Sequence, residues 1–246
     1  MDVIKQTDWA ALLRDATAGD AFAQSYVGTI YAEGALGPDG AMLVRRSRIT
    51  AKKWLLKSAE QSCPSGQLAL SNLLSDVDCN DSDFPAAITW AKRALAQGDA
   101  SAAHNLACIY RDMRKPSSAF RYFKRAVEMG SDDDLLDCAL CYLTGYGVAQ
   151  NFVLAAECLE RVRACNSERV TRATHESALY WSAVINLLEL AGSKRSVTNA
   201  RQLLERANVD DDHAQANELL CLIGKTPQAA QKKKPARQAG RAGGTS

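Results

Sequence analysis

The hydrophobic positions along this chain recur with a helical period in one segment after another. Counted from Gly19, small or apolar residues stand two, four, eight, nine and twelve positions later, and at about 100° per residue these offsets fall within one arc of a helix. We call this series of five offsets a ladder. The same ladder starts at Gly98 and at Gly130, and weaker copies start at Ser62 and Asp211. The pattern predicts a series of helices, each with one buried stripe, which we call helix A of each unit.

A second pattern, Ala-x-x-aromatic-x-x-basic-small, lies between these ladders and predicts a partner helix B. Successive copies are 36, 32, 36 and 45 residues apart, a spacing typical of helix-pair repeats with loops of variable length. One such pair cannot cover its own apolar faces, so neighbouring pairs must stack. The sequence therefore predicts an all-α fold, an α-solenoid of stacked antiparallel helix pairs. The five copies begin at Ala51, Ala87, Ala119, Ala155 and Ala200.

Three motifs carry a resemblance to a known family. They are Gly19-Asp20-Ala21-x-Ala23-Gln24-x-x-Val27-Gly28-x-x-Tyr31-x-x-Gly34, Tyr142-x-x-Gly145-x-Gly147-Val148 and Ala51-x-x-Trp54-x-x-Lys57-Ser58-Ala59. With these residues the chain resembles the Sel1-like repeat family, which is related to the tetratricopeptide repeats. The resemblance covers roughly residues 18–224 and implies a Sel1-like superhelix with adaptor or scaffold work. Between residues 163 and 192 helices are expected, but their repeat register cannot be aligned.

The chain is expected to divide into three parts. Residues 1–17 form an N-terminal capping helix, residues 18–224 form about five helix pairs with a C-terminal capping helix, and residues 225–246 form a disordered basic tail. The net charge is +2, and the last 22 residues hold six Lys or Arg and no acid, which leaves −4 on the rest. Without aromatic residues, the tail predicts weak nonspecific contact with anions and no specific binding of nucleic acid.

Composition argues against several classes of protein. No stretch approaches the roughly 18 apolar residues of a membrane helix, and residues 1–9 lack the apolar core of a signal peptide, so we expect no membrane contact and a cytoplasmic location. The eight cysteines do not recur at a fixed spacing in each unit, which favours free thiols. Cys138-x-x-Cys141 has a spacing found in metal sites, but no second pair lies nearby, so packing is the favoured interpretation.

Catalytic chemistry is not predicted, and neither a cofactor nor a metal ion is expected. The three histidines, His104, His175 and His213, stand in different units, and no Gly-rich phosphate loop follows a predicted strand, because no convincing strand is predicted. A Cys/His-dependent enzyme stays open as a minority alternative, since such partners are adjacent only in space. It requires a Cys/His pair within hydrogen-bond reach in a pocket. The acidic runs 132–134 and 210–212 are interpreted as helix starts that cap free N–H groups.

Helix A lines the concave face in this family, so the positions opposite its buried stripe predict a groove for a protein partner. Phe22 and Tyr26 are the preferred anchors, and an equally weighted alternative packs them on the N-terminal helix around residues 9–13. The loop from Gly34 to Ile49 carries Arg45, Arg46 and Arg48, which form either a basic contact loop or, as we favour, a solvated turn. The groove positions are Phe22, Ser25, Tyr26, Thr29, Leu68, Asn72, His104, Asn105, Leu136, Asp137 and Leu140.

The sequence thus predicts a non-enzymatic protein–protein interaction module, an adaptor or scaffold whose partner cannot be named from the chain. An alternative with the same groove is an immunity or inhibitor protein that blocks one dedicated toxin or enzyme.

Overall fold

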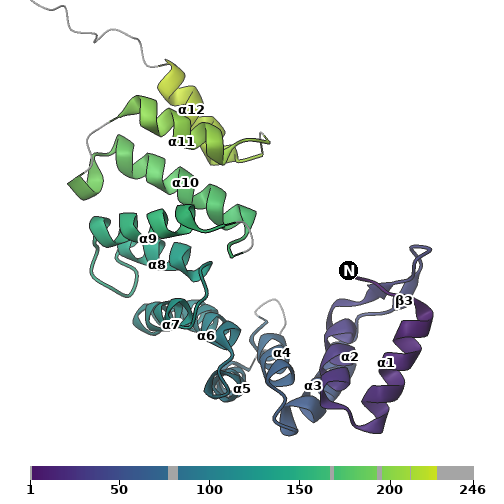
Figure 1. The fold of residues 1–246 in the computed structure, drawn as a ribbon. Helices are drawn as coiled ribbons and strands as arrows, with labels where there is room; N and C mark the ends of the chain where they lie inside the picture. Colours follow the sequence, from purple (N-terminus) through teal and green to yellow (C-terminus); the bar gives the residue numbers. More distant parts are fainter. Residues whose placement is uncertain (1, 77–82, 167–168, 193–195, 211, 226–246) are drawn as a thin grey trace, which may run out of the picture.

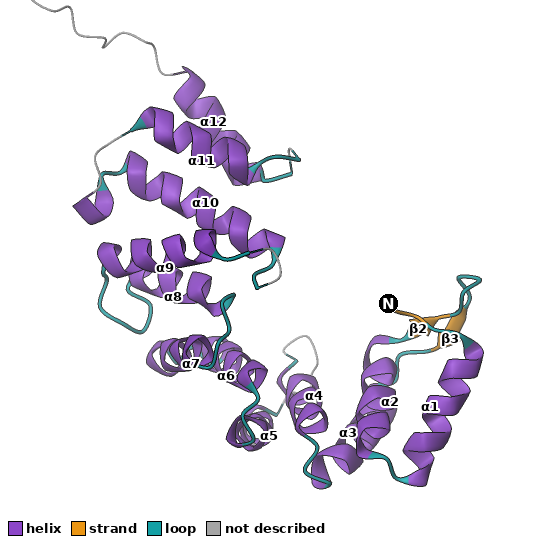
Figure 2. Ribbon diagram, viewed as in Figure 1, coloured by secondary structure: helices purple, strands orange, loops and turns teal. Residues whose placement is uncertain are grey.

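The computed structural model describes residues 2–76, 83–166, 169–192, 196–210 and 212–225, and these form a curved array of helices with one small sheet (Figures 1 and 2). A short 3₁₀ turn, Leu190–Gly192, follows the tenth helix. The helices are α1 (Gln6–Ala18), α2 (Ala21–Glu33), α3 (Arg48–Glu60), α4 (Pro64–Ser75), α5 (Phe84–Ala96), α6 (Ala100–Asp112), α7 (Pro116–Glu128), α8 (Asp134–Thr144), α9 (Phe152–Ala164), α10 (Arg172–Leu187), α11 (Val197–Ala207) and α12 (Ala214–Lys225).

The helices pack as five successive pairs, α2/α3 to α10/α11, with α1 before the first pair and α12 after the last. Helices α2, α4 and α6 lie on the inner side of the curve, and α3, α5 and α7 lie on its outer side (Figure 1). Across neighbouring pairs, α2 contacts α4, α4 contacts α6, and α8 contacts α10. The predicted fold class, an α-solenoid of stacked antiparallel pairs, is confirmed.

Each helix A buries the stripe that its ladder predicts. We call each offset of the ladder a rung. The rung eight residues after the start of the ladder is buried in four successive units, at Val27, Leu70, Leu106 and Cys138. The next rung holds a small residue where two helices approach closely. At Gly28 an added Cβ would lie 2.6 Å from the Leu55 side chain and 3.1 Å from its backbone nitrogen, so only glycine fits between α2 and α3 at this distance.

The segment whose repeat register could not be aligned contains α10. This helix packs between α9 and α11 and so serves as helix A of the fifth pair. Ala178, Leu179 and Ala183 form its buried face. Because the two helix B blocks on either side of α10 are 45 residues apart, against 32 to 36 in the earlier units, its register could not be read from the repeat spacing.

A three-stranded sheet lies next to the C-terminal end of α2. It corrects the expectation that no strand forms. Strand β2 (Ala35–Leu36) pairs parallel with β1 (Asp2–Val3) and antiparallel with β3 (Met42–Val44), as Figure 2 shows in orange. The loop of residues 34–49 is therefore a short hairpin to which the N-terminus adds a strand. Strands of two or three residues are too short to show the alternation from which a strand is predicted.

Buried glutamines connect the first units. Gln24 Nε2 donates to the Ala16 carbonyl (3.1 Å) and Gln24 Oε1 accepts from Gln61 (2.8 Å). One unit later, Gln67 donates to the Ala59 carbonyl (3.3 Å) and accepts from Gln97 (2.9 Å). We call these four side chains, Gln24, Gln61, Gln67 and Gln97, the amide relay. Each buried amide uses both of its ends, so the relay satisfies the polar groups that it buries.

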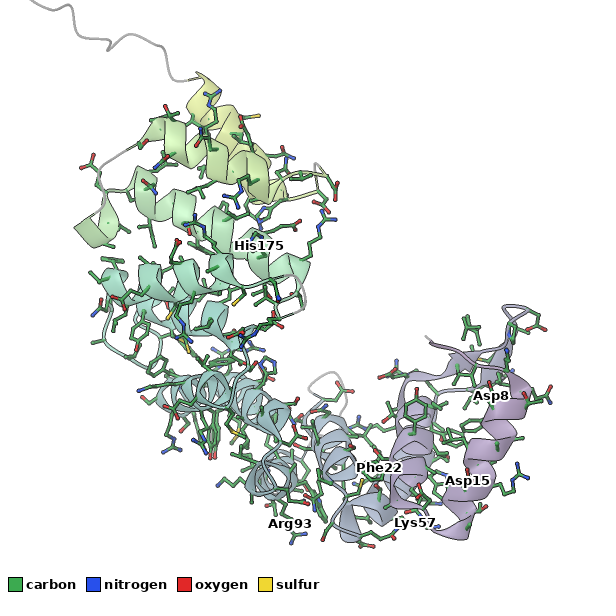
Figure 3. The ribbon with its side chains drawn as sticks, viewed as in Figure 1. Asp8, Asp15, Phe22, Lys57, Arg93 and His175 are labelled. Carbon is green, nitrogen blue, oxygen red and sulfur yellow. The ribbon has the colours of Figure 1, made fainter. Side chains whose placement is uncertain are left out.

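On helix B, the aromatic and basic residues of the repeated block contact each other. The Lys57 ammonium lies 4.6 Å from the centre of the Trp54 ring, and the Arg93 guanidinium lies 4.4 Å from that of Trp90. Both are cation–π contacts. Lys57 and Arg93 lie on the outer side of the array (Figure 3), so the block covers the outer aromatic rings with charge.

No helix in the described part of the chain is both long and apolar enough to cross a membrane. The predicted tail, residues 225–246, lies outside the described residues except for Lys225, the last residue of α12.

Candidate functional site

The two preferred anchors are exposed on α2. Phe22 is 66% exposed and Tyr26 58% exposed, one helical turn apart. Phe22 lies in the first turn of α2 (Figure 3). The N-terminal helix packs through Trp9, Leu12 and Leu13 against the buried stripe of α2 instead. This packing closes the end of the array and leaves both aromatic side chains in solvent.

Two other predicted groove residues are buried between helices. Ser25 is 6% exposed and Asn105 is 9% exposed. Asn105 Nδ2 donates to Ser71 Oγ (2.9 Å), which donates to the Ala87 carbonyl (2.8 Å). The Asn105 and Ser71 side chains therefore connect neighbouring helices. Because Ser25 and Asn105 are buried, neither offers surface to a partner. Of the remaining positions, Asn72 and His104 are exposed, and Thr29, Leu68, Leu136, Asp137 and Leu140 are half-buried.

The three arginines of the first loop have different surroundings. Arg46 Nε donates to the Ala32 carbonyl (2.8 Å), and Arg48 pairs with Asp76 (3.2 Å). Arg45 is exposed. Arg46 therefore attaches the hairpin to α2, whereas Arg48, the first residue of α3, attaches that helix to the end of α4.

The acidic run 132–134 stands at the start of α8, as predicted, but its interpretation as a cap of free N–H groups is wrong. No side chain caps α8 at its N-terminal residue Asp133. Asp133 Oδ1 accepts instead from the Thr171 backbone N–H (2.9 Å), and Asp132 pairs with Arg169 (2.6 Å). Both carboxylates hold the segment that leads into α10.

The run 210–212 does not cap α12 either, as far as its described residues show. Asp210 and Asp212 both pair with Arg172, and Asp211 lies outside the described residues. The free N–H of Ala216 donates to His213 Nδ1 (3.2 Å), so a histidine caps this helix.

The cysteines behave as the sequence predicts. All seven in the described residues are free thiols, and Cys79 lies outside them. Cys138 and Cys141 are both buried in the core between α6, α7 and α8. Burial raises the pKa of both thiols, that of Cys141 to about 11, so neither supplies a thiolate at neutral pH.

A cluster that the sequence did not reveal joins α6 to α8. His104 Nδ1 donates to Asp134 Oδ1 (2.7 Å), and His104 Nε2 lies 3.4 Å from Cys108 Sγ. Asp134 Oδ2 accepts from Ser131 Oγ (2.5 Å). With Asp137, one turn further along α8, a nitrogen and two carboxylate oxygens of this cluster lie within 4.8 Å of one another. Ligand atoms of these types in such a group can hold a metal ion.

The charges of this cluster are unusual for a repeat joint. Asp134 is 1% exposed at a rung that holds Ala23, Gly66 and Ala102 in the other units. The hydrogen bond between Asp134 and His104, followed by the one between Cys108 and His104, raises the pKa of His104 to about 10. Burial, and then the charge of Asp134, raises the pKa of Asp137. At neutral pH an imidazolium therefore faces the buried carboxylate.

Cys108, His104 and Asp134 also have the order nucleophile, base and orienting acid that the minority enzyme alternative requires. That alternative further requires a pocket. Surface hollows of about 270 and 600 Å³ are present on the array, and neither is lined by Cys108 or His104. The pair lies on an exposed helix face, with the His104 side chain 48% exposed, where water is not excluded.

Known proteins are similar to this chain in both sequence and fold. The profile of the Sel1 repeat matches residues 21–63, 81–99, 100–131 and 135–162. The crystal structure of c5321, a protective antigen present in uropathogenic Escherichia coli strains, has a TM-score of 0.70 at 23% identity and covers 89% of this chain. This chain spans only 44% of c5321. Among curated proteins, none matches.

Two further solved structures share the fold. A Sel1 repeat protein from Oxalobacter formigenes has a TM-score of 0.64 at 20% identity, covering 89% of this chain and 82% of its own. YrrB, a TPR protein with an unusual peptide-binding site, has a TM-score of 0.50 at 16% identity, covering 82% of this chain and 92% of its own.

Proposed function

Because this chain belongs to the Sel1 repeat family, we propose that it is a non-enzymatic adaptor or scaffold that binds a protein partner on the inner face of its array. Sel1-like and tetratricopeptide-like folds commonly serve as protein–protein interaction scaffolds. Stacked repeats create extended concave surfaces of the kind that such proteins use for binding.

The exposure of Phe22 and Tyr26 is the observation that carries this proposal. The two rings stand one turn apart on α2, 66% and 58% exposed, although the N-terminal helix packs on the same helix beside them. Large aromatic side chains are the most frequent anchors of protein interfaces, because each buries a large area on binding and loses little conformational entropy.

The proposed surface continues from α2 along the inner helices. Asn72 and His104 are exposed on α4 and α6, and half-buried leucines flank them at Leu68 and Leu136. Such a mixture of aromatic, amide and aliphatic groups is typical of protein interfaces. The cytoplasm remains the proposed compartment, in keeping with the free thiols of the described residues.

An immunity or inhibitor protein is the alternative, and it would use the same surface. The two differ in their partners: an inhibitor binds one enzyme or toxin with fixed stoichiometry, and a scaffold binds several partners more weakly. Affinity purification of the full chain followed by native mass spectrometry separates them.

Photocrosslinking tests the surface itself. A photoreactive phenylalanine analogue placed at Tyr26 is expected to capture a protein partner in cells, and one placed at Ile49 on α3, which is 73% exposed, is the matched control. Tyr26→Ala is then expected to weaken the purified partner's affinity at least tenfold, or about 1.4 kcal/mol, and Ile49→Ala to leave it unchanged. Capture from position 49 alone, or equal affinity losses for both variants, would contradict the proposed surface.

A further inference from the structure

The cluster between α6 and α8 shares His104 with the proposed binding surface, but its chemistry differs from that of the other repeat joints. His104 comes from the third pair, and Asp134 and Asp137 come from the fourth. We propose that these three side chains form a binding site for one divalent transition-metal ion, with zinc as the best match. This inference is independent of whether the inner face binds a protein.

The geometry brings three ligand atoms together. They lie within 4.8 Å of one another, and ligands around a tetrahedral zinc ion are about 3.3 to 3.8 Å apart, given bonds of about 2.0 to 2.3 Å. His104 Nδ1 and Asp134 Oδ1, now 2.7 Å apart, would separate slightly, and the longer separations would close. The remaining closure falls on side chains that can move, because His104 is exposed and Asp137 is half-buried, whereas Asp134 is fixed in the core. Water has access from the solvent side of His104, so it can complete the coordination.

Two of the proposed ligands, His104 and Asp134, are each oriented by a neighbouring side chain. In both, the neighbour contacts the atom that would not bind the ion. His104 Nε2 contacts Cys108 Sγ (3.4 Å), which leaves Nδ1 directed at Asp134. Asp134 Oδ2 accepts from the Ser131 hydroxyl, which leaves Oδ1 directed at His104. Metal-binding histidines and carboxylates are usually oriented by such outer partners. The Phe123 ring, edge-on to His104 at 6.1 Å between centres, further restricts the imidazole.

Charge balance favours a cation. Asp137 has no hydrogen-bonded or ion-paired partner among the described residues, and Asp134 is buried. The two carboxylates lie within 4.8 Å of one imidazole nitrogen, and Arg111 is a further positive charge that acts on Asp137. A divalent ion in place of the Nδ1 proton gives a neutral site, which removes the repulsion between Asp134 and Asp137.

The donor set selects the kind of ion. One imidazole nitrogen with two carboxylate oxygens suits zinc and its first-row neighbours, whereas calcium and magnesium prefer sites made of oxygen alone. Cys108 lies on the far nitrogen of the ring, so it orients His104 and does not bind the same ion.

Calorimetric titration of the metal-free full chain with zinc chloride, under reducing conditions, tests the site. One equivalent is expected to bind. Asp137→Asn, which keeps the side-chain shape, is expected to weaken binding at least tenfold, and His104→Gln to abolish it. His175→Gln is the matched control and should bind zinc as the unmodified chain does. Circular dichroism of each variant checks that the helices persist.

Cobalt absorption separates this site from binding at thiols, because all of these variants keep the eight cysteines. Cobalt bound at the proposed site is expected to lack the near-ultraviolet band of a cobalt–thiolate bond, and Cys108→Ser is expected to keep zinc bound. The proposal is overturned if a thiolate band appears, if His104→Gln and Asp137→Asn bind as tightly as the unmodified chain, or if no saturable binding occurs. The last result would leave His104 and Asp134 as an ion pair alone.

Discussion

The joints between successive helix pairs are built in two different ways, one near the N-terminal end of the array and one in its middle. From α2 to α5, neutral amides in the amide relay connect the units, and its two buried members, Gln24 and Gln67, each donate one hydrogen bond and accept another. Between α6 and α8, a histidine and two aspartates take over, and the ladder position of Gln24 and Gln67 is filled by Ala103 and Leu135.

This difference separates a polar group that completes the fold from one that carries chemistry. An amide with a partner at each end is neutral and presents no charge for a cation to neutralise. At the α6–α8 joint, the Asp137 carboxylate makes no hydrogen bond or ion pair within the described part of the chain, and a half-exposed imidazole lies beside the buried Asp134. A repeat fold can therefore carry a reactive group at one joint without altering the others, because each unit contacts only its neighbours.

The largest effect is expected where the first joint depends on close packing. In Gly28→Leu the new side chain would collide with Leu55 on α3, and the loss in the free energy of unfolding is expected to be about 3 kcal/mol or more. Urea titration followed by circular dichroism measures it, with Thr29→Leu on the partly exposed neighbouring position as the control. Equal stabilities for the two variants would show that α2 and α3 do not meet at Gly28.

The difference between the two kinds of joint is tested by comparing the loss in the free energy of unfolding in Gln67→Ala with that in Asp134→Ala. Gln67→Ala removes a buried amide that bonds to the Ala59 carbonyl and to Gln97. The two lost hydrogen bonds and the space left behind are expected to cost about 1 to 3 kcal/mol. Asp134→Ala is expected to cost less than about 1 kcal/mol, because alanine occupies this rung at Ala23 and Ala102 and the half-exposed His104 can remain solvated.

The same unfolding titrations measure both losses. If Asp134→Ala is the more destabilising of the two, the α6–α8 cluster serves the fold just as the amide relay does, and the distinction between the two joints fails.

A smaller effect is expected at Asn105, which the sequence placed in the partner groove and the structure buries. Asn105→Ala removes the donor to Ser71 and is expected to lower stability by about 1 kcal/mol. His104→Ala, one residue earlier on the exposed face, is expected to change it less. Thermal unfolding of the two variants gives the order, and the reverse order would mean that His104 holds the joint more firmly than the buried amide does.

The smallest effect is expected at Tyr26. Because its ring is 58% exposed and lies outside the packing of the N-terminal helix, Tyr26→Ala is expected to change the free energy of unfolding by no more than about 0.5 kcal/mol. Trp9→Ala, on the packed side of the same end, is the contrast, since Trp9 contacts Tyr31 at 5.6 Å between ring centres. A large loss for Tyr26→Ala would assign this ring to the fold.

The sequence predicted the parts of the fold that repeat. The offsets from Gly19, Gly98 and Gly130 placed Val27, Leu106 and Cys138 in the core, because a helical period determines burial wherever units stack. The sequence did not reveal the three strands, because they are too short to show a pattern. It also did not reveal the register of α10, because the repeat spacing is longer there.

The cluster could not be found by spacing, because His104 and Asp134 belong to different units and face each other only after stacking. One signal was nevertheless present. Asp134 stands at a rung where the other units have Ala23, Gly66 and Ala102, and a carboxylate in place of a small core residue requires a partner. Exposure of Phe22 and Tyr26 could not be read from the sequence either, since it depends on which face of α2 the N-terminal helix covers.

The cation–π contacts on the outer face bear on how copies of this protein meet one another in a crowded solution. Exposed indole rings promote self-association, but here Lys57 covers Trp54 and Arg93 covers Trp90. Two arrays that approached back to back would bring these cations together before the rings could touch, and like charges repel. At these two positions the cations therefore oppose ring-to-ring contact between two copies of the protein.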